Sequence, residues 1–288
     1  MVKEKKKKKK KNAFDFLEIT ELPPKPRETS LVEIRGPYYS AITANYLEGL
    51  LDDWGEYFDG FKFAGGSFRL LKEDKLRKYI KLCHDYQVYV STGGWVERVL
   101  VYGQRAVDQY LEECKALEFD VVEISSGMAP EVMNMPLEDK MALVKQVKKL
   151  GMQPKPEVSI ISNAGAGTNV GEYKLDYRGI EEFFKETEAY VKAGAKIIMV
   201  ESEGITEDLP EERWRKDIIQ KMSEKFGFEK FMFEASDPTV FKWYYKTFGR
   251  AVNLFIDHSQ VVEFNVWRHR IWGDQKIWKD KKIRYSPQ

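Results

Sequence analysis

A short strand-like run followed by an amphipathic helical run recurs eight times along this chain, and this alternation restricts the fold more than any other feature of the sequence. The predicted strands are Leu31–Ile34, Phe58–Phe63, Val88–Ser91, Val121–Ser125, Gln153–Val158, Lys196–Glu201, Lys230–Glu234 and Val252–Asp257. The predicted helices are Thr43–Trp54, Glu73–Asp85, Gln104–Leu117, Leu137–Leu150, Asp176–Ala193, Glu211–Phe226, Pro238–Phe248 and Ser259–Trp272. Eight such pairs predict an α/β protein folded as a (β/α)8 barrel.

The same alternation would also suit an open, doubly wound sheet. Against that alternative, no Gly-x-Gly-x-x-Gly sequence follows the first predicted strand. The length of 288 residues is ordinary for one barrel, for which about 250 residues is typical. The closed barrel is therefore the preferred interpretation.

Charge and composition predict the limits of the folded domain. Residues 3–11 are almost all lysine and cannot bury apolar surface, so we expect a disordered tail over residues 1–13. A single barrel domain over 14–278 and a C-terminal tail over 279–288 complete the predicted organisation.

The remaining charge is balanced, with 47 Lys and Arg against 46 Asp and Glu, so neither nucleic acid nor a membrane is expected as a partner. Cys83 and Cys114 both lie in helical patterns, which is typical of a reducing compartment. No stretch approaches the roughly 18 apolar residues of a membrane span. We therefore expect a cytoplasmic protein, whose lysine-rich start would also allow nuclear import.

Acidic side chains recur where the predicted strands end, which is where barrel enzymes place their catalytic groups. They are Glu97, Glu123, Glu157, Glu201 and Glu234. Carboxylates converging on one rim need a cation, and oxygen ligands without a Cys or His cluster favour Mg²⁺ over zinc. The alternative is that some of them pair with Lys62 and Lys155 as ion pairs inside the barrel.

Other features suit a small anionic substrate. The small-residue loops Gly65–Ser67 and Gly165–Thr168 would let backbone donors approach an oxyanion. Ser259 begins the final helix, a common phosphate site in barrels, although serine is also an ordinary N-cap. His258 beside it would move a proton near neutral pH. The aromatic run 241–245 most simply packs a helix on the barrel, and any exposed remainder would suit a homo-oligomer surface.

Short stretches in a regular order resemble the phosphosulfolactate synthase (ComA-type) family and its plant heat-stress-associated relatives. The matching stretches are Lys25–Arg27, Phe61–Phe63 with Gly65–Ser67, Gly93–Gly94 with Glu97, Val122–Ser125 with Gly127, Phe233–Ala235, Asn253–Leu254 and Gly273–Asp274. The resemblance implies a barrel enzyme that adds sulfite to phosphoenolpyruvate with Mg²⁺.

The resemblance also implies roles for individual residues. The phosphate and carboxylate of the substrate would be held by Arg27, Lys62 and Arg268, together with Gly65, Gly66, Gly93, Gly94 and Ser259. The metal would be held by Glu123, Glu157 and Glu201. The predicted catalytic set is Lys155, Glu157 and His258, with Lys155 or His258 moving the proton.

This chain departs from the family pattern in three places. Glu157–Ile161 lacks the family's lysine pair, Glu201–Gly204 lacks an arginine, and Trp272 stands where a second arginine is usual after Arg268. A changed substrate is therefore one alternative. Another is a non-catalytic stress-associated or scaffold protein that keeps the barrel.

Overall fold

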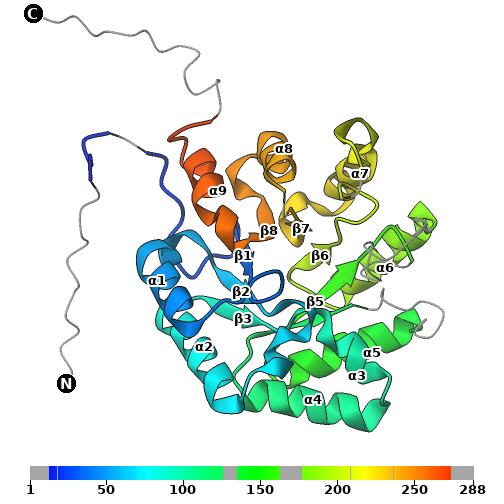
Figure 1. Cartoon of the computed structure of the whole chain (residues 1–288). Helices are drawn as coiled ribbons and strands as arrows, with labels where there is room; N and C mark the ends of the chain where they lie inside the picture. Colours follow the sequence, from blue (N-terminus) through cyan, green and yellow to red (C-terminus); the bar gives the residue numbers. More distant parts are fainter. Residues whose placement is uncertain are drawn as a thin grey trace, which may run out of the picture.

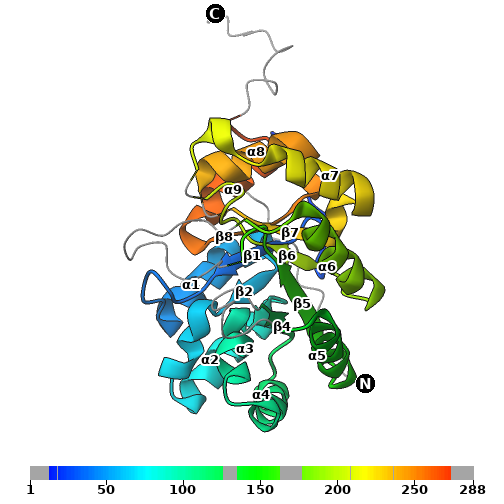
Figure 2. The ribbon, with the colours of Figure 1, turned by 90° about the vertical axis from the view of Figure 1, so that its right-hand side faces the viewer.

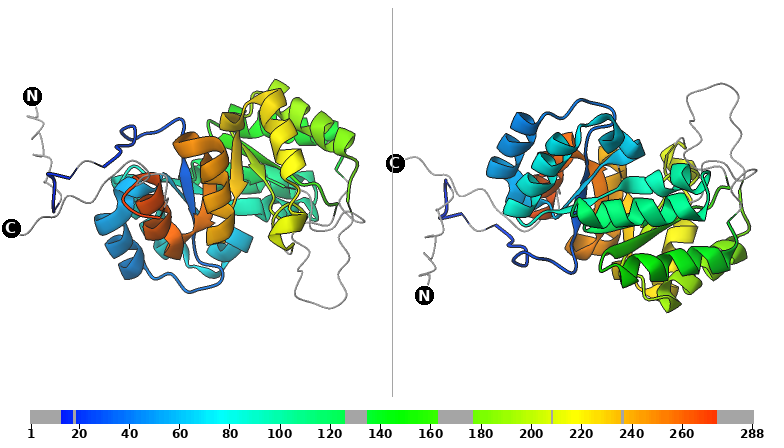
Figure 3. Two further views of the ribbon diagram at one scale, coloured as in Figure 1. Left: turned by 90° about the horizontal axis from the view of Figure 1, so that it is seen from above. Right: turned by 90° about the horizontal axis from the view of Figure 1, so that it is seen from below.

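Eight parallel strands close into one barrel, in the order β1-β2-β3-β4-β5-β6-β7-β8. In this computed structural model, the residues described are 13–17, 19–125, 135–162, 177–207, 209–235 and 237–273. The helices lie outside the strands (Figure 1), and views from other sides show the same arrangement (Figures 2 and 3). The predicted (β/α)8 fold is confirmed.

The strands are short and have the bounds β1 Val32–Arg35, β2 Gly60–Lys62, β3 Tyr89–Ser91, β4 Val121–Ile124, β5 Gln153–Val158, β6 Ile198–Val200, β7 Phe231–Glu234 and β8 Asn253–Asp257. The α-helices are α1 Ala44–Trp54, α2 Glu73–Asp85, α3 Val96–Leu100, α4 Gln104–Ala116, α5 Leu137–Lys149, α6 Ile180–Lys192, α7 Lys216–Phe226, α8 Pro238–Phe248 and α9 Val261–Arg268. Each predicted strand and helix has its counterpart in this order.

The differences from the predicted elements have local causes. The short helix α3 follows a 3₁₀ turn after β3 and was not predicted, because five residues are too few to show a helical period. Helix α7 begins at Lys216 instead of Glu211, since residues 211–213 form a separate 3₁₀ turn. Helix α9 ends at Arg268, and Arg270, with φ of 56°, lies in the left-handed region that terminates helices.

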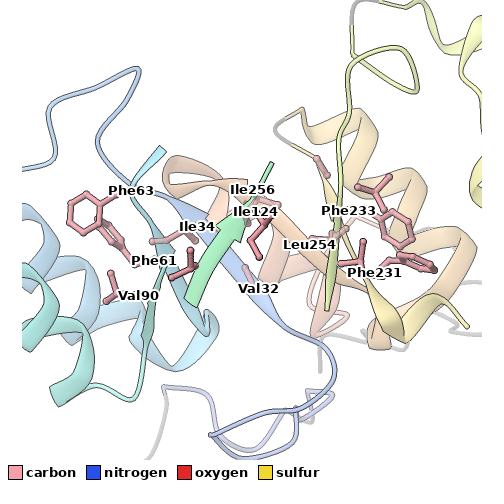
Figure 4. Packing of buried hydrophobic residues seen from close by; sticks show 14 of the residues in the cluster. Val32, Ile34, Phe61, Phe63, Val90, Ile124, Phe231, Phe233, Leu254 and Ile256 are labelled. Carbon is pink, nitrogen blue, oxygen red and sulfur yellow. The ribbon is translucent and has the colours of Figure 1, made fainter. Parts of the chain in front are cut away.

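The main hydrophobic core lies between the strands and the surrounding helices. Outward-facing strand residues alternate with inward-facing ones, and Figure 4 shows Phe61, Phe63, Phe231, Phe233 and Leu254 among the buried side chains of this layer. A smaller apolar cluster contains Leu31, Ile197, Met199, Met232 and Phe255, from the alternate positions. The rest of the barrel interior is available for polar side chains.

Helix signals and turn chemistry agree with the observed boundaries. Thr43 caps α1 by accepting a hydrogen bond from the Tyr46 amide, and Asp237 caps α8, with Pro238 in the first helical turn. Within the described residues, every helix is too short or too polar to cross a membrane.

Candidate active site at the carboxyl end of the barrel

A chain of buried ion pairs crosses the inside of the barrel from β1 and β2 to β4 and β5. The Lys155 ammonium lies 2.6 and 2.7 Å from the two Glu33 carboxylate oxygens and 3.1 Å from Glu123. Lys62 lies 2.7 Å from the other Glu123 oxygen. The Tyr89 hydroxyl donates to Glu33 over 2.8 Å. Buried charges require such partners, and this part of the site matches the alternative of inner-barrel ion pairs.

The ion pairs fix the protonation of Glu123. Burial alone would raise the pKa of this carboxyl, but Lys62 and Lys155 outweigh burial and lower the pKa below its usual value. The pKa of Lys62 is raised in turn, because the surrounding carboxylates outweigh the opposing effect of burial. Glu123 and Lys62 are therefore both charged at neutral pH.

A second ion pair lies nearer the mouth of the barrel. Arg35, at the end of β1, donates to Glu234 of β7 over 2.5 Å. Its guanidinium also lies 4.8 Å from the ring centre of Tyr39 and 5.0 Å from that of Phe255. Lys62 lies 4.2 Å from the same Phe255 ring, so Arg35 and Lys62 bring two cations to one side of the mouth.

Glu157 and Glu201, at the ends of β5 and β6, have no ion-pair partner among the described residues. Burial and then the Glu123 charge raise the pKa of Glu157 well above its usual range. Burial, Glu234 and Glu157 do the same to the pKa of Glu201. Glu201 also accepts hydrogen bonds from the Ser202 and Glu203 amides, over 2.7 and 3.2 Å. A proton or an added cation would compensate the remaining charge of the two carboxyls.

The donor chemistry at Glu157 and Glu201 fits Mg²⁺, which prefers oxygen ligands and is often held by only one or two carboxylates together with substrate and water. Glu123 is already engaged by two lysines. The described part of the chain contains no group of three or more Asp, Glu, His or Cys side chains able to hold a metal ion. A metal at Glu157 and Glu201 would thus depend on substrate oxygens to complete its coordination.

The glycines predicted to bind phosphate also have packing roles. Gly65 and Gly66 have positive φ angles of 57° and 69°, and a Cβ on them would lie 2.2 Å from Tyr38 and 2.0 Å from Trp95. A Cβ on Gly93 would lie 2.6 Å from a backbone oxygen, and one on Gly94 2.4 Å from the Ser125 hydroxyl. Contact with phosphate stays a prediction.

His258 and Ser259 occupy the rim after β8. The two ring nitrogens of His258 each lie 2.9 Å from a hydroxyl, of Ser40 and of Tyr46. The backbone amide and hydroxyl of Ser259 both donate to Asp257, which is the N-cap of this turn. The N-cap is therefore Asp257 rather than Ser259, because its carboxylate accepts the first free amide.

The contacts of Arg27 and Arg268 lie at the opposite, amino-terminal end of the barrel. Arg27 bonds the Asp59 carboxylate, which precedes β2, at 2.8 Å. Arg268 is fully buried and donates to the carbonyl of Ser30, which precedes β1. Both side chains therefore make these contacts away from Lys62, and a phosphate contact by either of them stays a prediction.

The other predicted residues are placed as follows. Glu97 is buried in α3, and its charge is among those that raise the pKa of Glu157, so it belongs to the same neighbourhood. Gly127, the loop 165–168, Asp274 and the two tails beyond residues 13 and 273 lie outside the described residues.

Sequence reasoning missed Glu33, Arg35 and Tyr89 in the site and Tyr46 on its rim. Glu33 and Arg35 alternate with the apolar Val32 and Ile34 along β1. This period-two pattern is the signal that places charged side chains on the inner face of a strand. Ending the predicted strand at Ile34 left Arg35 outside it.

The chain is a closed (β/α)8 barrel with buried charged side chains at the carboxyl ends of its strands, which is where barrel enzymes build their active sites. A sequence model of the family described as (2R)-phospho-3-sulfolactate synthase (ComA) matches residues 20–274. The chain belongs to this family.

Two relatives illustrate its place in the family. Protein HEAT-STRESS-ASSOCIATED 32 of Arabidopsis thaliana is 34% identical over 269 residues, which cover 90% of this chain and 92% of that protein. Phosphosulfolactate synthase of Methanocaldococcus jannaschii is 24% identical over 238 residues, covering 81% and 89% of the two chains. The family assignment and the predicted resemblance agree.

Solved structures with low sequence identity support the fold alone. Deoxyribose phosphate aldolase of Aeropyrum pernix has a TM-score of 0.52 at 12% identity and covers 84% of this chain and 91% of its own. Phospho-2-dehydro-3-deoxyheptonate aldolase of Thermotoga maritima has a TM-score of 0.52 at 13% identity, covering 84% and 68%.

Proposed function

We propose that this protein is an enzyme of the phosphosulfolactate synthase type, which acts on a small phosphorylated, anionic substrate at the carboxyl end of the barrel. The observation that carries the proposal is the buried, ion-paired Lys62–Glu123–Lys155 chain beside two carboxyls, Glu157 and Glu201, that lack a cation. Buried charges with incomplete compensation destabilise a folded protein. Groups with strongly shifted pKa values cluster at functional sites.

The charged residues of the site would bind the substrate, position one another and hold the metal. Lys62 and Arg35 would hold the negative charges of the substrate, because both are cations at the carboxyl ends of their strands and lie against the Phe255 ring. Among the described residues, the polar partners of Lys155 are Glu33 and Glu123, and Lys155 would position Glu123. Glu157 and Glu201 would hold Mg²⁺, which when bound supplies positive charge to substrate oxygens.

For sulfite and phosphoenolpyruvate, sulfur would bond to the terminal alkene carbon, and the electron pair of the double bond would move toward the carboxylate. Lys62 and Arg35 would stabilise that developing charge. A proton would then be added to the carbon that bears the phosphate. His258, hydrogen-bonded to two hydroxyls at the rim, is our candidate for delivering it.

The first test is turnover and ligand binding by the purified full chain. Phosphoenolpyruvate and sulfite with Mg²⁺ should yield phosphosulfolactate, and phosphoenolpyruvate with Mg²⁺ should raise the melting temperature. A ligand at about 100 times its dissociation constant stabilises the folded state by about 2.7 kcal/mol. No product and no Mg²⁺-dependent shift with phosphoenolpyruvate, phospholactate or phosphate would overturn the proposal.

Glu157→Gln is the decisive variant, since it keeps the shape of the side chain and removes its charge. We expect turnover to fall by about 100-fold or more, the usual scale for loss of one group that stabilises transition-state charge. Glu112→Gln, an exposed residue of α4, is the matched control and should keep full turnover. Equal turnover in both variants would remove Glu157 from the chemistry.

A second candidate function is a stress-associated role without catalysis. It is favoured by one observation, the higher identity to the plant heat-stress-associated protein than to the archaeal synthase. Heat survival of cells that carry Glu157→Gln in place of the natural protein separates the two functions. Survival equal to that with the natural protein would favour the non-catalytic role, and loss of survival would favour the enzyme.

A further inference from the structure

The imidazole of His258 lies on the rim of the barrel, between two hydroxyl groups from the segment that follows β1. Its Nε2 atom lies 2.9 Å from the Ser40 hydroxyl, and its Nδ1 atom lies 2.9 Å from the Tyr46 hydroxyl. The Tyr46 and His258 rings also meet edge to face, with their centres 5.4 Å apart. Both ring nitrogens are therefore engaged, so a proton that leaves His258 passes through one of these two hydroxyls.

Hydroxyl partners suit a histidine that gains and loses a proton. A hydroxyl both donates and accepts, whereas a carbonyl only accepts and an ammonium only donates. The imidazolium form of His258 would donate to Ser40 and to Tyr46, and the neutral form would donate to one of them and accept from the other. Neither form leaves a ring nitrogen without a partner, so these hydrogen bonds do not oppose a change of protonation.

A neighbouring carboxylate favours a proton on Nε2 of His258. Asp257 lies 4.0 Å from this nitrogen, and the same carboxylate oxygen accepts from the amide and hydroxyl of Ser259. A negative charge at that distance attracts positive charge to the nearer side of the imidazole. The nitrogen that contacts Ser40 is therefore the preferred site of the transferable proton.

The loop between β1 and α1 brings Ser40 beside the proposed substrate site. The ring of Tyr39, the residue before it, lies 4.8 Å from the Arg35 guanidinium. Arg35 is in register with Asp257, the residue before His258, where β1 pairs with β8. Arg35 is one of the two cations that we place against the anionic end of the substrate. The exposed Ser40 thus lies between this cation and His258 along the rim.

Tyr46 has a different position and a different use. It belongs to α1, outside the ring of strands, and its amide donates to the Thr43 cap over 3.2 Å. Burial and then the Asp257 charge raise the pKa of the Tyr46 hydroxyl. This hydroxyl therefore keeps its proton at neutral pH. Because the helix fixes its position, it holds Nδ1 of His258 in place and does not carry the proton onward.

We propose that Ser40 relays a proton from His258 to the substrate and that Tyr46 is a positioning residue for the imidazole. The relay rests on the proposed function, whereas the contacts of the ring do not. In the step, the electron pair on the carbon that bears the phosphate takes the proton of the Ser40 hydroxyl and forms the new C–H bond. The Nε2 proton of the imidazolium replaces it, so Ser40 is unchanged and His258 is left neutral.

The first measurement is turnover of phosphoenolpyruvate and sulfite by the full chain. Ser40→Ala should lower kcat by about 100-fold with little change in KM, because general acid catalysis acts in the transition state. Ser40→Thr restores the hydroxyl and should recover most of the lost rate. Tyr46→Phe keeps the ring and should lower kcat by a smaller factor. Ser223→Ala removes a hydroxyl from α7 on the outside of the barrel and, as the matched control, should keep full turnover.

The second measurement needs no turnover and follows the two ring nitrogens of His258 by nitrogen NMR. Ser40→Ala should move the Nε2 signal more than the Nδ1 signal, because it removes the hydrogen bond to Nε2. Tyr46→Phe should do the reverse. Ser40→Thr and the control Ser223→Ala should leave both signals close to their positions in the natural protein.

The two measurements separate the relay from the proposed function. Turnover that Ser40→Ala leaves unchanged overturns the relay, and a natural kcat in Tyr46→Phe overturns the positioning role. If the natural protein shows no turnover, the proposed function fails and the nitrogen signals decide alone. An Nε2 signal moved by Ser40→Ala then supports Ser40 as the proton route of His258, and an unmoved signal overturns it.

Discussion

The two ends of the barrel both bury charged side chains, yet they use them differently. At the amino-terminal end, Arg27 donates to the Pro23 carbonyl, the Glu56 carbonyl and the Asp59 carboxylate, over 2.8, 2.9 and 2.8 Å. At the carboxyl end, Glu157 and Glu201 remain without a cation among the described residues, beside the ion-paired Lys62 and Glu123.

The charges at the amino-terminal end are paired within the protein and stabilise the fold, whereas those at the carboxyl end are available to bind a ligand. Arg27 holds the segment before β1 against the residues before β2, and Asp59 also accepts from the Val32 amide at 2.9 Å. Arg268 is less well satisfied, because its Nε and Nη1 atoms have no partner in the described chain and burial lowers its pKa to about 10. It still remains charged at neutral pH and ties α9 to the start of β1.

The largest expected effect comes from breaking the pair at the amino-terminal end. Arg27→Met leaves Asp59 buried without its cation, so the free energy of unfolding should fall by about 3–5 kcal/mol. Urea denaturation measures this change. Glu56→Gln is the control, because that side chain is 70% exposed and its removal should cost less than about 1 kcal/mol. Equal losses in the two variants would contradict the structural role of Arg27.

At the carboxyl end, the two glutamates without a cation predict that the stability of the protein falls as the pH rises. The raised pKa values of Glu157 and Glu201 mean that the folded state holds protons which the unfolded state has released. Stability from these groups is present below the ordinary glutamate pKa of about 4.3 and is lost as pH rises toward the raised values, by up to about 1.4 kcal/mol per pH unit and group.

Denaturation of the natural protein and of Glu157→Gln, Glu201→Gln between pH 5 and 8 isolates this contribution. The double variant should lose the slope and be the more stable protein at pH 8. Added Mg²⁺ should stabilise the natural protein at pH 8 and leave the double variant unchanged. Parallel pH curves for the two proteins would show that the two carboxyls are already compensated.

The smallest effect concerns the backbone at the mouth. Gly66→Ala combines a positive φ of 69° with a Cβ 2.0 Å from Trp95, so unfolding free energy should fall by about 1–3 kcal/mol. Gly49→Ala, in α1 with nothing within 4 Å of the new Cβ, should instead gain about 0.5–1 kcal/mol. Thermal unfolding of both variants tests whether this loop is closely packed.

The fold was predictable because each of its elements carries a local signal. Helix α2 and strand β5 agree with their predicted limits, and Asp237–Pro238 marks the start of α8. The signals fail where an element is short, as in α3, or where a 3₁₀ turn precedes the helix, as before α7. In those places hydrogen bonding by the folded chain, which periodicity does not report, decides the boundary.

For the site, the sequence by itself determined which side chains end the strands: Lys62, Glu123, Glu157, Glu201 and Glu234 follow from strand position alone. It did not determine that Lys155 binds Glu33, or that Arg35 binds Glu234, 199 residues away. Nor did it show that Arg27 and Arg268 lie at the other end of the barrel. Only the closure of the barrel sets these distances, because charges pair through space and a strand's own sequence does not name its partner across the interior.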